Sequence, residues 1–579
     1  MIDETELKDV VVERSVAIPM RDGVRLFADI WRPATDEALP VLVTRTPYNR
    51  ASLVAMGGGA PLAREGYVVV SQDCRGRFES EGKHWCPVEL DIDDGYDTVE
   101  WAAAQPWSNG KVGMFGASYM GYTQWQAAIA RPPSLVAILP ECSASEYWDP
   151  VWGPGGAFRM ANRTGWTLMV ALEEARRLGL DDPMVREVTK AQDAAGLDLV
   201  ARSQAMAPIV RDLMAHRPLR AVPFFEKAAP WYAEYFDHEG RDHPRWLRSN
   251  PRSHYAEIDL PVIHVGGWYD VMTTSTIDAF LGMRGSGPTE ASRQNQWMII
   301  GPWTHWGIAS GVVGDLDFGP DATLDIHALR CDWFGHWLHG NELAQLDRPP
   351  VRIFVMGENV WRDEHEWPLA RTQWTPWHLQ AEGHLGPDLP EASAPDAYTF
   401  DPIDPVPTLG GRMLMAAGDA RGGPIEQGDV ASRPDVLAYT SEPLSAPMEI
   451  TGPVRVELWA STSAPDTDFT AKLVDVRPDG TSYNICDGIV RTRTVVAIPL
   501  QAGAVYSLPI DLAATSVLVP TGHRLQVQIS SSSFPMWEPN ANTANPAGTD
   551  RHEDLRPAHQ QLFHDPAHPS RIVLPIIPR

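Results

Sequence analysis

A chain of 579 residues exceeds a single ordinary domain, and its length predicts two to four domains. Hydrophobic residues make up 44% and charged residues 21%, a composition that is typical of a soluble globular protein. The formal net charge of −27 argues against sequence-independent nucleic-acid binding, because that binding depends on Lys and Arg side chains facing phosphates. These values favour a small neutral or cationic ligand.

The sequence contains no run of 18 apolar residues, so we expect no membrane-spanning segment and no membrane partner. The acidic start, residues 1–15, lacks a basic segment followed by an apolar one, and we therefore expect a cytoplasmic location. The five cysteines are scattered and form no C-x-x-C pair, which argues against a disulfide framework or a zinc ribbon. We expect these thiols to be reduced.

Short apolar runs and helical patterns alternate through the first third of the chain and return later. Strands are expected at residues 10–20, 24–33, 40–48, 66–76, 112–115, 135–143, 260–270 and 295–305, and helices at residues 93–105 and 122–130. Strands that alternate with helices indicate a mostly parallel α/β sheet. Ligand sites in such sheets lie at the carboxyl ends of the strands.

Two changes in pattern divide the chain into domains. Residues 145–250 are rich in helical pattern, Trp and Phe, and we interpret them as an inserted helical cap. From about residue 350, Pro-rich connectors and alternating strands replace the helices, which predicts a β-sandwich or jelly roll. The predicted domains are an α/β domain in two parts (1–144 and 251–350), the cap (145–250) and a β domain (351–579).

Ser118 lies between Gly116 and Gly121, where a predicted strand turns into a predicted helix. A nucleophile elbow requires a serine on a strained turn with very small neighbours, and Gly116 and Ala117 meet that requirement. The common elbow reads G-x-S-x-G, whereas here the second glycine comes one position later. The alternative is a serine that caps the following helix. A partner base and an orienting acid elsewhere in the sequence would favour the nucleophile elbow over the helix cap.

Two later strand ends carry suitable partners, in the order Ser, Asp, His that α/β-hydrolases have. One run ends at Asp270 and the next ends at His305, so both residues are expected at the same sheet edge as Ser118. A serine hydroxyl needs a neutral imidazole to accept its proton, and a carboxylate must orient that imidazole. The sequence therefore predicts a triad of Ser118, His305 and Asp270. His264 lies inside its strand and is interpreted as a core residue.

The tetrahedral intermediate of such a reaction needs hydrogen-bond donors for its oxygen. The first expected donor is the backbone N–H of Tyr119, directly after the nucleophile. Tyr48 offers its phenol as the second donor, the alternative being a surface tyrosine beside a proline turn. Residues 57–60, GGGA, lack the ending of a phosphate-binding loop and are interpreted as a flexible loop.

Two further histidines raise the question of a metal. His336 and His339 are three residues apart, as helix neighbours can be, but no carboxylate or cysteine pattern accompanies them. We therefore expect no metal site, and the predicted reaction needs no cofactor.

The sequence resembles the family of cocaine esterase, α-amino acid ester hydrolase and glutaryl-cephalosporin acylase, which is related to the X-prolyl dipeptidyl aminopeptidases. The matching blocks are residues 20–33, 45–50, 72–82, 94–125, 266–270, 300–305, 451–480 and 568–578, so the resemblance covers almost the whole chain. It implies an α/β-hydrolase domain with an inserted helical cap and a C-terminal β jelly-roll domain. It also implies that the shifted glycine is the family's own form of the elbow.

The resemblance carries the triad onto Ser118, Asp270 and His305, and the oxyanion hole onto Tyr48 and the Tyr119 amide. Trp152 matches a cap tryptophan that lines the acyl pocket. The implied activity is that of a serine esterase or acylase acting on a small-molecule ester or amide through an acyl-enzyme. Because relatives form dimers or larger assemblies, a homo-oligomer is an open alternative to a monomer.

Departures from the family bear on the substrate. α-Amino acid ester hydrolases hold the substrate ammonium with acids shortly after the catalytic aspartate, whereas VMTTST follows Asp270 here, so an α-amino acyl substrate is disfavoured. X-prolyl peptidases carry an additional N-terminal domain, and few residues precede Met20, which disfavours that role. Two alternatives remain open: acyl transfer to an amine or alcohol, and a binding protein whose jelly roll acts while the hydrolase domain is vestigial.

Overall fold

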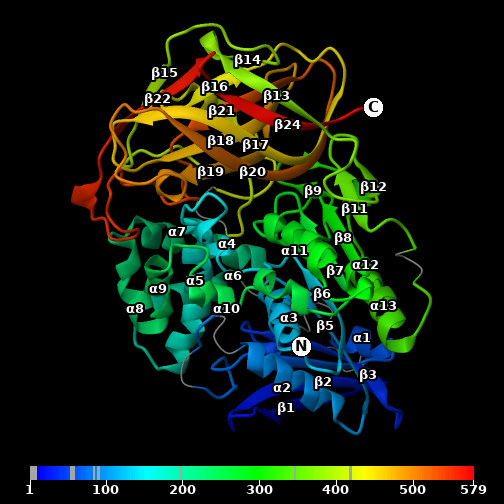
Figure 1. The fold of residues 1–579 in the computed structure, drawn as a ribbon. Coiled ribbons are helices and arrows are strands. Elements are labelled where there is room, and N and C mark those ends of the chain that lie inside the picture. Colours follow the sequence, from blue (N-terminus) through cyan, green and yellow to red (C-terminus); the bar gives the residue numbers. More distant parts are fainter. Residues whose placement is uncertain are drawn as a thin grey trace.

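The computed structural model describes residues 9–51, 59–82, 85–87, 91–195, 199–343, 347–415 and 420–579. Among these residues, a ten-stranded sheet and a twelve-stranded sheet form the two largest β structures. Figure 1 shows the second sheet above the first, with a group of helices beside the first sheet and below the second. Residues 57 and 58 of the predicted glycine loop lie outside the described residues, and Gly59 begins a helix.

The first sheet has the strand order β1-β2-β4-β3-β5-β6-β7-β8-β11-β12. Its strands are β1 (Val10–Pro19), β2 (Arg25–Pro33), β3 (Leu39–Thr46), β4 (Val68–Asp73), β5 (Ser108–Ala117), β6 (Leu135–Glu141), β7 (Val262–Gly267), β8 (Gln296–Gly301), β11 (Val351–Val355) and β12 (Val360–Glu364). From β4 to β11 in this order the neighbours run parallel. The predicted parallel α/β sheet is therefore confirmed.

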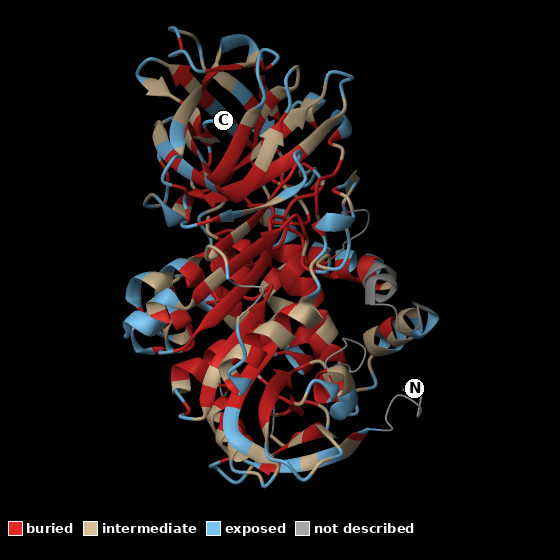
Figure 2. Cartoon of the chain, turned by 90° about the vertical axis from the view of Figure 1, so that its right-hand side faces the viewer, coloured by how far each residue is buried: buried red, intermediate tan, exposed pale blue. Residues whose placement is uncertain are grey.

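Helices cover both faces of this sheet, because successive side chains of a strand point to opposite sides. Val41 and Val43 pack with α2 (Asp91–Ala103), α3 (Tyr119–Ala130) and α11 (Thr273–Ser286). Leu42, between them, packs on the other face with α1 (Gly59–Arg64) and α13 (Ile326–Phe334). Buried strands therefore read as nearly continuous apolar runs rather than as an alternation. Figure 2 shows this buried layer through the middle of the molecule.

A helical segment connects β6 to β7 within the region predicted to be helical. Its helices are α4 (Asp149–Trp152), α5 (Met160–Arg177), α6 (Pro183–Ala195), α7 (Leu199–Ala215), α8 (Pro223–Ala228), α9 (Trp231–Asp237) and α10 (Pro244–Arg248). An aromatic cluster holds them together; for example, Tyr232 contacts Phe225 at 4.7 Å and Phe236 at 5.7 Å between ring centroids. The segment thus has an apolar core of its own.

The second sheet contains the C-terminal strands, and nearly all its pairings are antiparallel. Its strands are β13 (Gln373–Gln380), β14 (His384–Gly386), β15 (Asp396–Phe400), β16 (Leu437–Thr440), β17 (Met448–Thr462), β18 (Asp468–Val476), β19 (Ser482–Arg491), β20 (Tyr506–Val519), β21 (Arg524–Ser530), β22 (Ala558–Asp565), β23 (His568–Pro569) and β24 (Arg571–Ile577). Apolar side chains from most of these strands share one core. The C-terminal region is β-rich, as the sequence predicts.

The predicted boundary at residue 350 falls before two strands of the first sheet. β11 pairs parallel with β8, through Val351 opposite Met298, and β12 pairs antiparallel with β11. The second sheet begins only at β13. Among the described residues, the α-helices end before the composition shift near residue 350, and composition does not reveal which sheet a following strand joins.

Candidate active site

The predicted nucleophile occupies a strained corner between β5 and α3. Ser118 has φ 61° and ψ −126°, a positive φ that non-glycine residues rarely adopt. Its N–H donates to the carbonyl oxygen of Glu141 on β6 at 2.9 Å. The conformation is therefore held by the neighbouring strand.

Both flanking glycines are required by close contacts. A Cβ at Gly116 would lie 2.7 Å from the Cβ of Met120, and Gly116 also has φ 130°. A Cβ at Gly121 would lie 2.5 Å from the Cβ of Ser143, on the chain that leaves β6. The second glycine is thus needed where it stands, one position later than in the common elbow, because the helix crosses the neighbouring chain there.

The interpretation of Ser118 as a helix cap is wrong. Ser118 occupies the N-cap position of α3, but its side chain makes no capping hydrogen bond. Its carbonyl oxygen instead accepts from the N–H groups of Gly121 and Tyr122, each at 3.0 Å. The hydroxyl is half-buried and lies within hydrogen-bonding reach of the Tyr48 phenol.

Asp270 and His305 form a buried pair at the ends of β7 and β8. His305 Nδ1 lies 2.9 Å from Asp270 Oδ1, and the two side chains are 1% and 0% exposed. Asp270 Oδ1 also accepts from the Met272 N–H at 3.1 Å. Burial alone would raise the pKa of Asp270, but the charge of His305 and these hydrogen bonds lower it below the usual carboxyl value. The carboxylate is therefore held ionised against the imidazole.

The thiol of Cys142 is a further neighbour of this carboxylate. It lies within hydrogen-bonding reach of Asp270, and burial raises the pKa of the thiol well above its ordinary value. Cys142 has φ 43°, and its N–H donates to Val265 on β7 at 2.7 Å. Cys142 thus places a protonated thiol beside Asp270, and the sequence analysis did not single it out.

The sheet brings the three predicted triad residues to one edge. Ser118 follows β5, Asp270 follows β7 and His305 follows β8, and these parallel strands lie side by side with β6 between the first two. Asp270 contacts His305 directly. Among the described residues, no hydrogen bond joins Ser118 to His305. The Ser118 side chain instead lies near the Tyr48 phenol; burial raises the pKa of that phenol, and the Ser118 side chain lowers it in part.

Tyr48 follows β3, at the same edge of the sheet. Its phenol oxygen accepts a hydrogen bond from the indole Nε1 of Trp166 at 2.9 Å. Burial raises the pKa of Tyr48, so the phenol keeps its proton and can act as a donor. The alternative of a surface tyrosine is wrong, because Tyr48 packs against the aromatic cluster of the helical segment.

Tyr119 begins α3 directly after Ser118, as the sequence requires for a backbone donor. Its side chain is turned into the protein, where the hydroxyl donates to Asp91 Oδ2 at 2.6 Å. The ring stacks on Trp166 at 6.1 Å with an interplanar angle of 18°. The side chain of Tyr119 therefore packs inside the protein. The group of Tyr119 that directly follows Ser118 in the chain is its backbone amide.

An aromatic group that the sequence analysis did not single out surrounds Tyr48 and Tyr119. Trp166 contacts Trp85 at 5.7 Å and Trp231 at 5.9 Å between ring centroids. The guanidinium of Arg163 lies over the Trp166 ring at 5.2 Å. The only signal in the sequence for Trp166 and Trp231 is the general abundance of tryptophan in the helical segment, and Trp85 lies outside that segment.

Trp152, predicted to line the acyl pocket, is a fully buried residue of α4. Its ring contacts Phe158 at 5.5 Å and Phe236 at 5.9 Å. Trp152 belongs to the same apolar cluster as Tyr119 and Trp166. Both of the rings that it contacts, Phe158 and Phe236, lie in the helical segment. Its role in binding stays a prediction.

The surroundings of His305 include residues of the C-terminal region. Trp306, 55% exposed, meets the His305 ring edge-on at 5.0 Å, and its indole donates to the Leu414 carbonyl at 3.0 Å. The Leu414 N–H in turn donates to Asn162 of α5 at 2.9 Å. Three regions of the chain therefore meet at this site.

Two other properties of the described residues bear on function. A cavity of about 370 Å³ lies on the C-terminal region, lined by Tyr398, Thr399, His559 and neighbouring Ser, Thr and Gln side chains, and contains none of the predicted site residues. Within the described part of the chain, no helix combines the length and apolar character needed to cross a bilayer.

Comparison with known proteins gives matches along nearly the whole chain. Residues 22–307 match the X-Pro dipeptidyl-peptidase (S15) family, and residues 345–573 match the X-Pro dipeptidyl-peptidase C-terminal non-catalytic domain. Cocaine esterase from Rhodococcus sp. (strain MB1 Bresler) is 38% identical over 98% of this chain and 99% of its own.

Two solved structures are similar to the whole chain. A selenomethionine-labelled α-amino acid ester hydrolase has a TM-score of 0.81 and 26% identity, covering 100% of this chain and 98% of its own. An aminopeptidase from a marine sediment archaeon of the Thaumarchaeota has the same TM-score, identity and coverage.

Proposed function

Because the chain belongs to the serine hydrolase family that includes cocaine esterase and the X-Pro dipeptidyl-peptidases, we propose that it hydrolyses a small carboxylic ester through an acyl-enzyme on Ser118. Asp270 and His305 complete the proposed triad. The observation that carries this proposal is the buried Asp270–His305 pair at the same sheet edge as the strained Ser118.

In the proposed reaction, His305 Nε2 accepts the proton of the Ser118 hydroxyl as the oxygen attacks the acyl carbon. Asp270 holds the Nδ1–H of the imidazole and stabilises the imidazolium that forms. His305 then gives the proton to the departing alcohol, which leaves the acyl group on Ser118. A water molecule, deprotonated by His305, attacks the acyl-enzyme and releases the carboxylic acid and the free serine.

The developing oxyanion is proposed to accept hydrogen bonds from the Tyr48 phenol and the Tyr119 amide. One such donor typically contributes about 3–4 kcal/mol to transition-state stabilisation. The position of Tyr48 beside the Ser118 hydroxyl and its raised pKa support this role. Trp166 is proposed to orient the phenol through its indole hydrogen bond.

The acyl group is proposed to be neutral and largely apolar or aromatic. The walls near Tyr48 are aromatic, and Trp152 is proposed to contribute to the pocket from α4. After Asp270 come Val271 and Met272, which are buried among apolar side chains. A substrate ammonium would find no carboxylate at that position.

The chain has an N-terminal hydrolase domain and a C-terminal β-rich domain. We propose that the helices between β6 and β7 act as a cap and that the C-terminal domain is a jelly roll that supports it. Contacts between the two favour this arrangement, since the Arg159 guanidinium lies over the Trp537 ring at 4.6 Å. The cytoplasmic location and the homo-oligomer stay predictions, and size-exclusion chromatography with light scattering tests the latter.

The test is hydrolysis of p-nitrophenyl esters, from short aliphatic to aromatic acyl groups, by wild type and by Ser118→Ala. Ser253→Ala, at an exposed serine, is the matched control. We expect activity in wild type and in the control and its loss in Ser118→Ala, together with labelling of Ser118 by an active-site phosphonate in the mass spectrum. Full activity in Ser118→Ala, or no labelling of wild type, would overturn the proposal.

Two added arms separate the alternatives. An Ala-Pro p-nitroanilide substrate tests the peptidase activity that gives the family its name. Addition of an amine or alcohol to the ester assay tests acyl transfer, because a transferase forms the new amide or ester at the expense of the free acid.

A further inference from the structure

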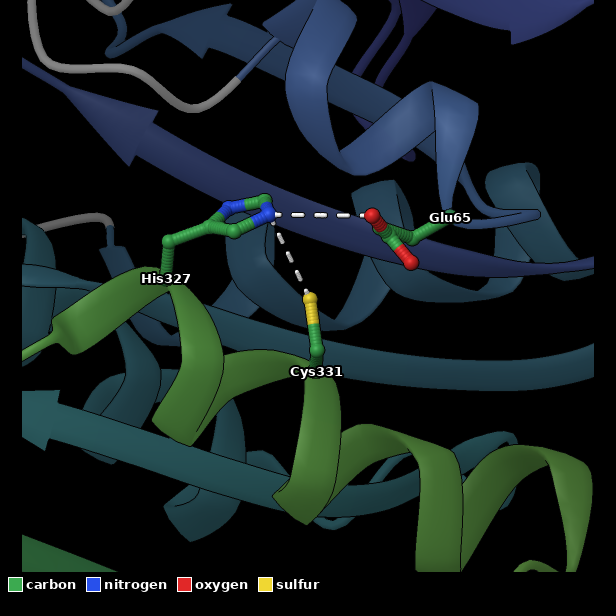
Figure 3. Close-up of side chains that lie close together, drawn as sticks. All are labelled: Glu65, His327 and Cys331. Atoms are coloured by element: carbon green, nitrogen blue, oxygen red, sulfur yellow. Dashed lines mark hydrogen bonds and ion pairs between the residues drawn. The ribbon is translucent and has the colours of Figure 1, made fainter.

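Glu65, His327 and Cys331 form a cluster on the face of the hydrolase sheet that carries α1 and α13 (Figure 3). His327 Nε2 lies 3.6 Å from Cys331 Sγ and 3.9 Å from Glu65 Oε1. All three donor atoms lie within 4.8 Å of one another. His327 and Cys331 are half-buried, whereas Glu65 is exposed.

These separations suit a tetrahedral metal ion. Bond lengths of about 2.0–2.1 Å to a histidine nitrogen and 2.3 Å to a cysteine sulfur imply a nitrogen-to-sulfur separation of roughly 3.5 Å. The His327–Cys331 distance already matches this value. The carboxylate lies slightly farther out, and because Glu65 is exposed, rotation of its side chain can close the difference.

The two half-buried donors project from one rigid helix. His327 and Cys331 are one turn apart on α13, so their side chains lie on the same face. α13 is anchored in the fold by its buried residues Leu329, Arg330, Trp333 and Phe334. Glu65 directly follows α1, and its N–H donates to Leu62 at 3.2 Å. Donors held on packed elements require little rearrangement to bind an ion.

We propose that Glu65, His327 and Cys331 bind one Zn²⁺ ion, with water as the fourth ligand. Imidazole, thiolate and carboxylate are the ligands that Zn²⁺ takes in proteins. Burial, with the negative charges of Glu65 and Asp325, raises the pKa of Cys331 to about 11, while Arg330 opposes the rise. The free thiol is therefore protonated at neutral pH, and binding of the ion displaces its proton.

The ion has a structural role in this proposal. It joins the end of α1 to α13, whose Arg330 makes a bidentate ion pair with Glu141 at 2.9 and 2.8 Å. The Glu141 carbonyl accepts from the Ser118 N–H. Binding thus stabilises a helix that supports the strand next to the elbow, and the ion takes no part in ester hydrolysis. The inference does not depend on the proposed function.

The test uses the full chain after chelator treatment, with Co²⁺ as a spectroscopic substitute for Zn²⁺. We expect one Co²⁺ per chain, a thiolate-to-cobalt charge-transfer band in the near ultraviolet, and visible bands of tetrahedral intensity. Cys331→Ser should abolish the charge-transfer band, and His327→Ala should weaken Co²⁺ binding at least about tenfold. Cys86→Ser and His336→Ala are the matched controls and should bind as wild type does.

A second measurement needs no variant. Zn²⁺ should protect Cys331 from iodoacetamide in wild type, as read by peptide mass spectrometry, and should raise the unfolding midpoint by a few degrees. Absence of the thiolate band in wild type, its persistence in Cys331→Ser, or alkylation of Cys331 at the same rate with and without Zn²⁺ would overturn the proposal. The cluster would then be an ordinary hydrogen-bonded surface group.

Discussion

The indole Nε1 of Trp166 donates a hydrogen bond of 2.9 Å to the phenol oxygen of Tyr48. Trp166 belongs to α5 in the helical segment, whereas Tyr48 follows β3 of the hydrolase sheet. The same phenol lies within hydrogen-bonding reach of the Ser118 hydroxyl. The helical segment therefore contacts the candidate oxyanion donor directly and influences how it is presented to the nucleophile.

Removal of this hydrogen bond should slow the reaction moderately. Trp166→Phe keeps an aromatic ring, and loss of a bond worth about 0.5–1.5 kcal/mol predicts a decrease in kcat/KM of roughly 2- to 13-fold. Tyr48→Phe removes the oxyanion donor itself and should lower kcat about 10²- to 10³-fold. Because Trp166 is expected to act through Tyr48, the double variant should be no slower than Tyr48→Phe. Additive losses would show that Trp166 acts independently.

Asp270→Asn should lower kcat by about 10³- to 10⁴-fold with little change in KM. The amide that replaces the carboxylate keeps the shape of the side chain but does not stabilise the imidazolium. Asp242→Asn, at an exposed aspartate before the same strand, is the control and should be neutral. Steady-state kinetics on the best p-nitrophenyl ester measures both variants. A loss below tenfold in Asp270→Asn would contradict the assignment of this acid.

Gly121→Ala should damage both stability and activity. The added Cβ would lie 2.5 Å from the Cβ of Ser143, and relief of that contact must shift α3 against the chain after β6. Overpacking of this kind destabilises by about 1–3 kcal/mol. Gly285→Ala is the matched control, because nothing lies within 4 Å of its Cβ position on α11.

For Gly285→Ala we expect a gain of about 0.5–1 kcal/mol from helix propensity. Thermal unfolding midpoints and ester hydrolysis report on both variants. Equal midpoints for Gly121→Ala and wild type would mean that the elbow tolerates a side chain there.

The stability of the β-rich domain should depend on pH through His564 and Asp396. His564 Nε2 lies 3.0 Å from Asp396 Oδ2. Burial lowers the pKa of His564, but the hydrogen bond and charge of Asp396 outweigh it and raise the pKa overall. The hydrogen bond from His564 lowers the pKa of Asp396. Both shifts favour the ionised pair.

A raised histidine pKa contributes stability that is complete below the unfolded value of about 6.5 and is lost as pH rises through the folded value. The lowered pKa of Asp396 contributes stability above about 3.9 that is lost as pH falls through its folded value. His564→Gln should therefore lower the unfolding midpoint most near pH 5–6, and the difference should shrink by about pH 9. His552→Gln, at an exposed histidine, is the control, and a pH-independent difference for His564→Gln would exclude the pair as its source.

Much of the sheet and its edge was predictable because the signals are local. The apolar runs that end at Asp270 and His305 correspond to β7 and β8 and the turns after them. Parallel strands bring their carboxyl ends to one edge, so the sequence alone predicts these residues beside Ser118. The close packing at the elbow is likewise indicated by the sequence, because glycines stand at positions 116 and 121, where a side chain would not fit.

Only the tertiary structure decided the remaining features, since they depend on contacts between residues far apart in the chain. β11 joins the first sheet by pairing with β8, and no composition signal separates such a strand from those of the next domain. Trp166 reaches Tyr48 because α5 packs against the loop after β3. Glu65, at the end of α1, likewise lies beside His327 and Cys331 of α13. Local periodicity in the sequence cannot predict a contact between segments so far apart in the chain. The amino-acid sequence by itself determined which residues end the strands, and the packing of whole elements determined which side chains meet there.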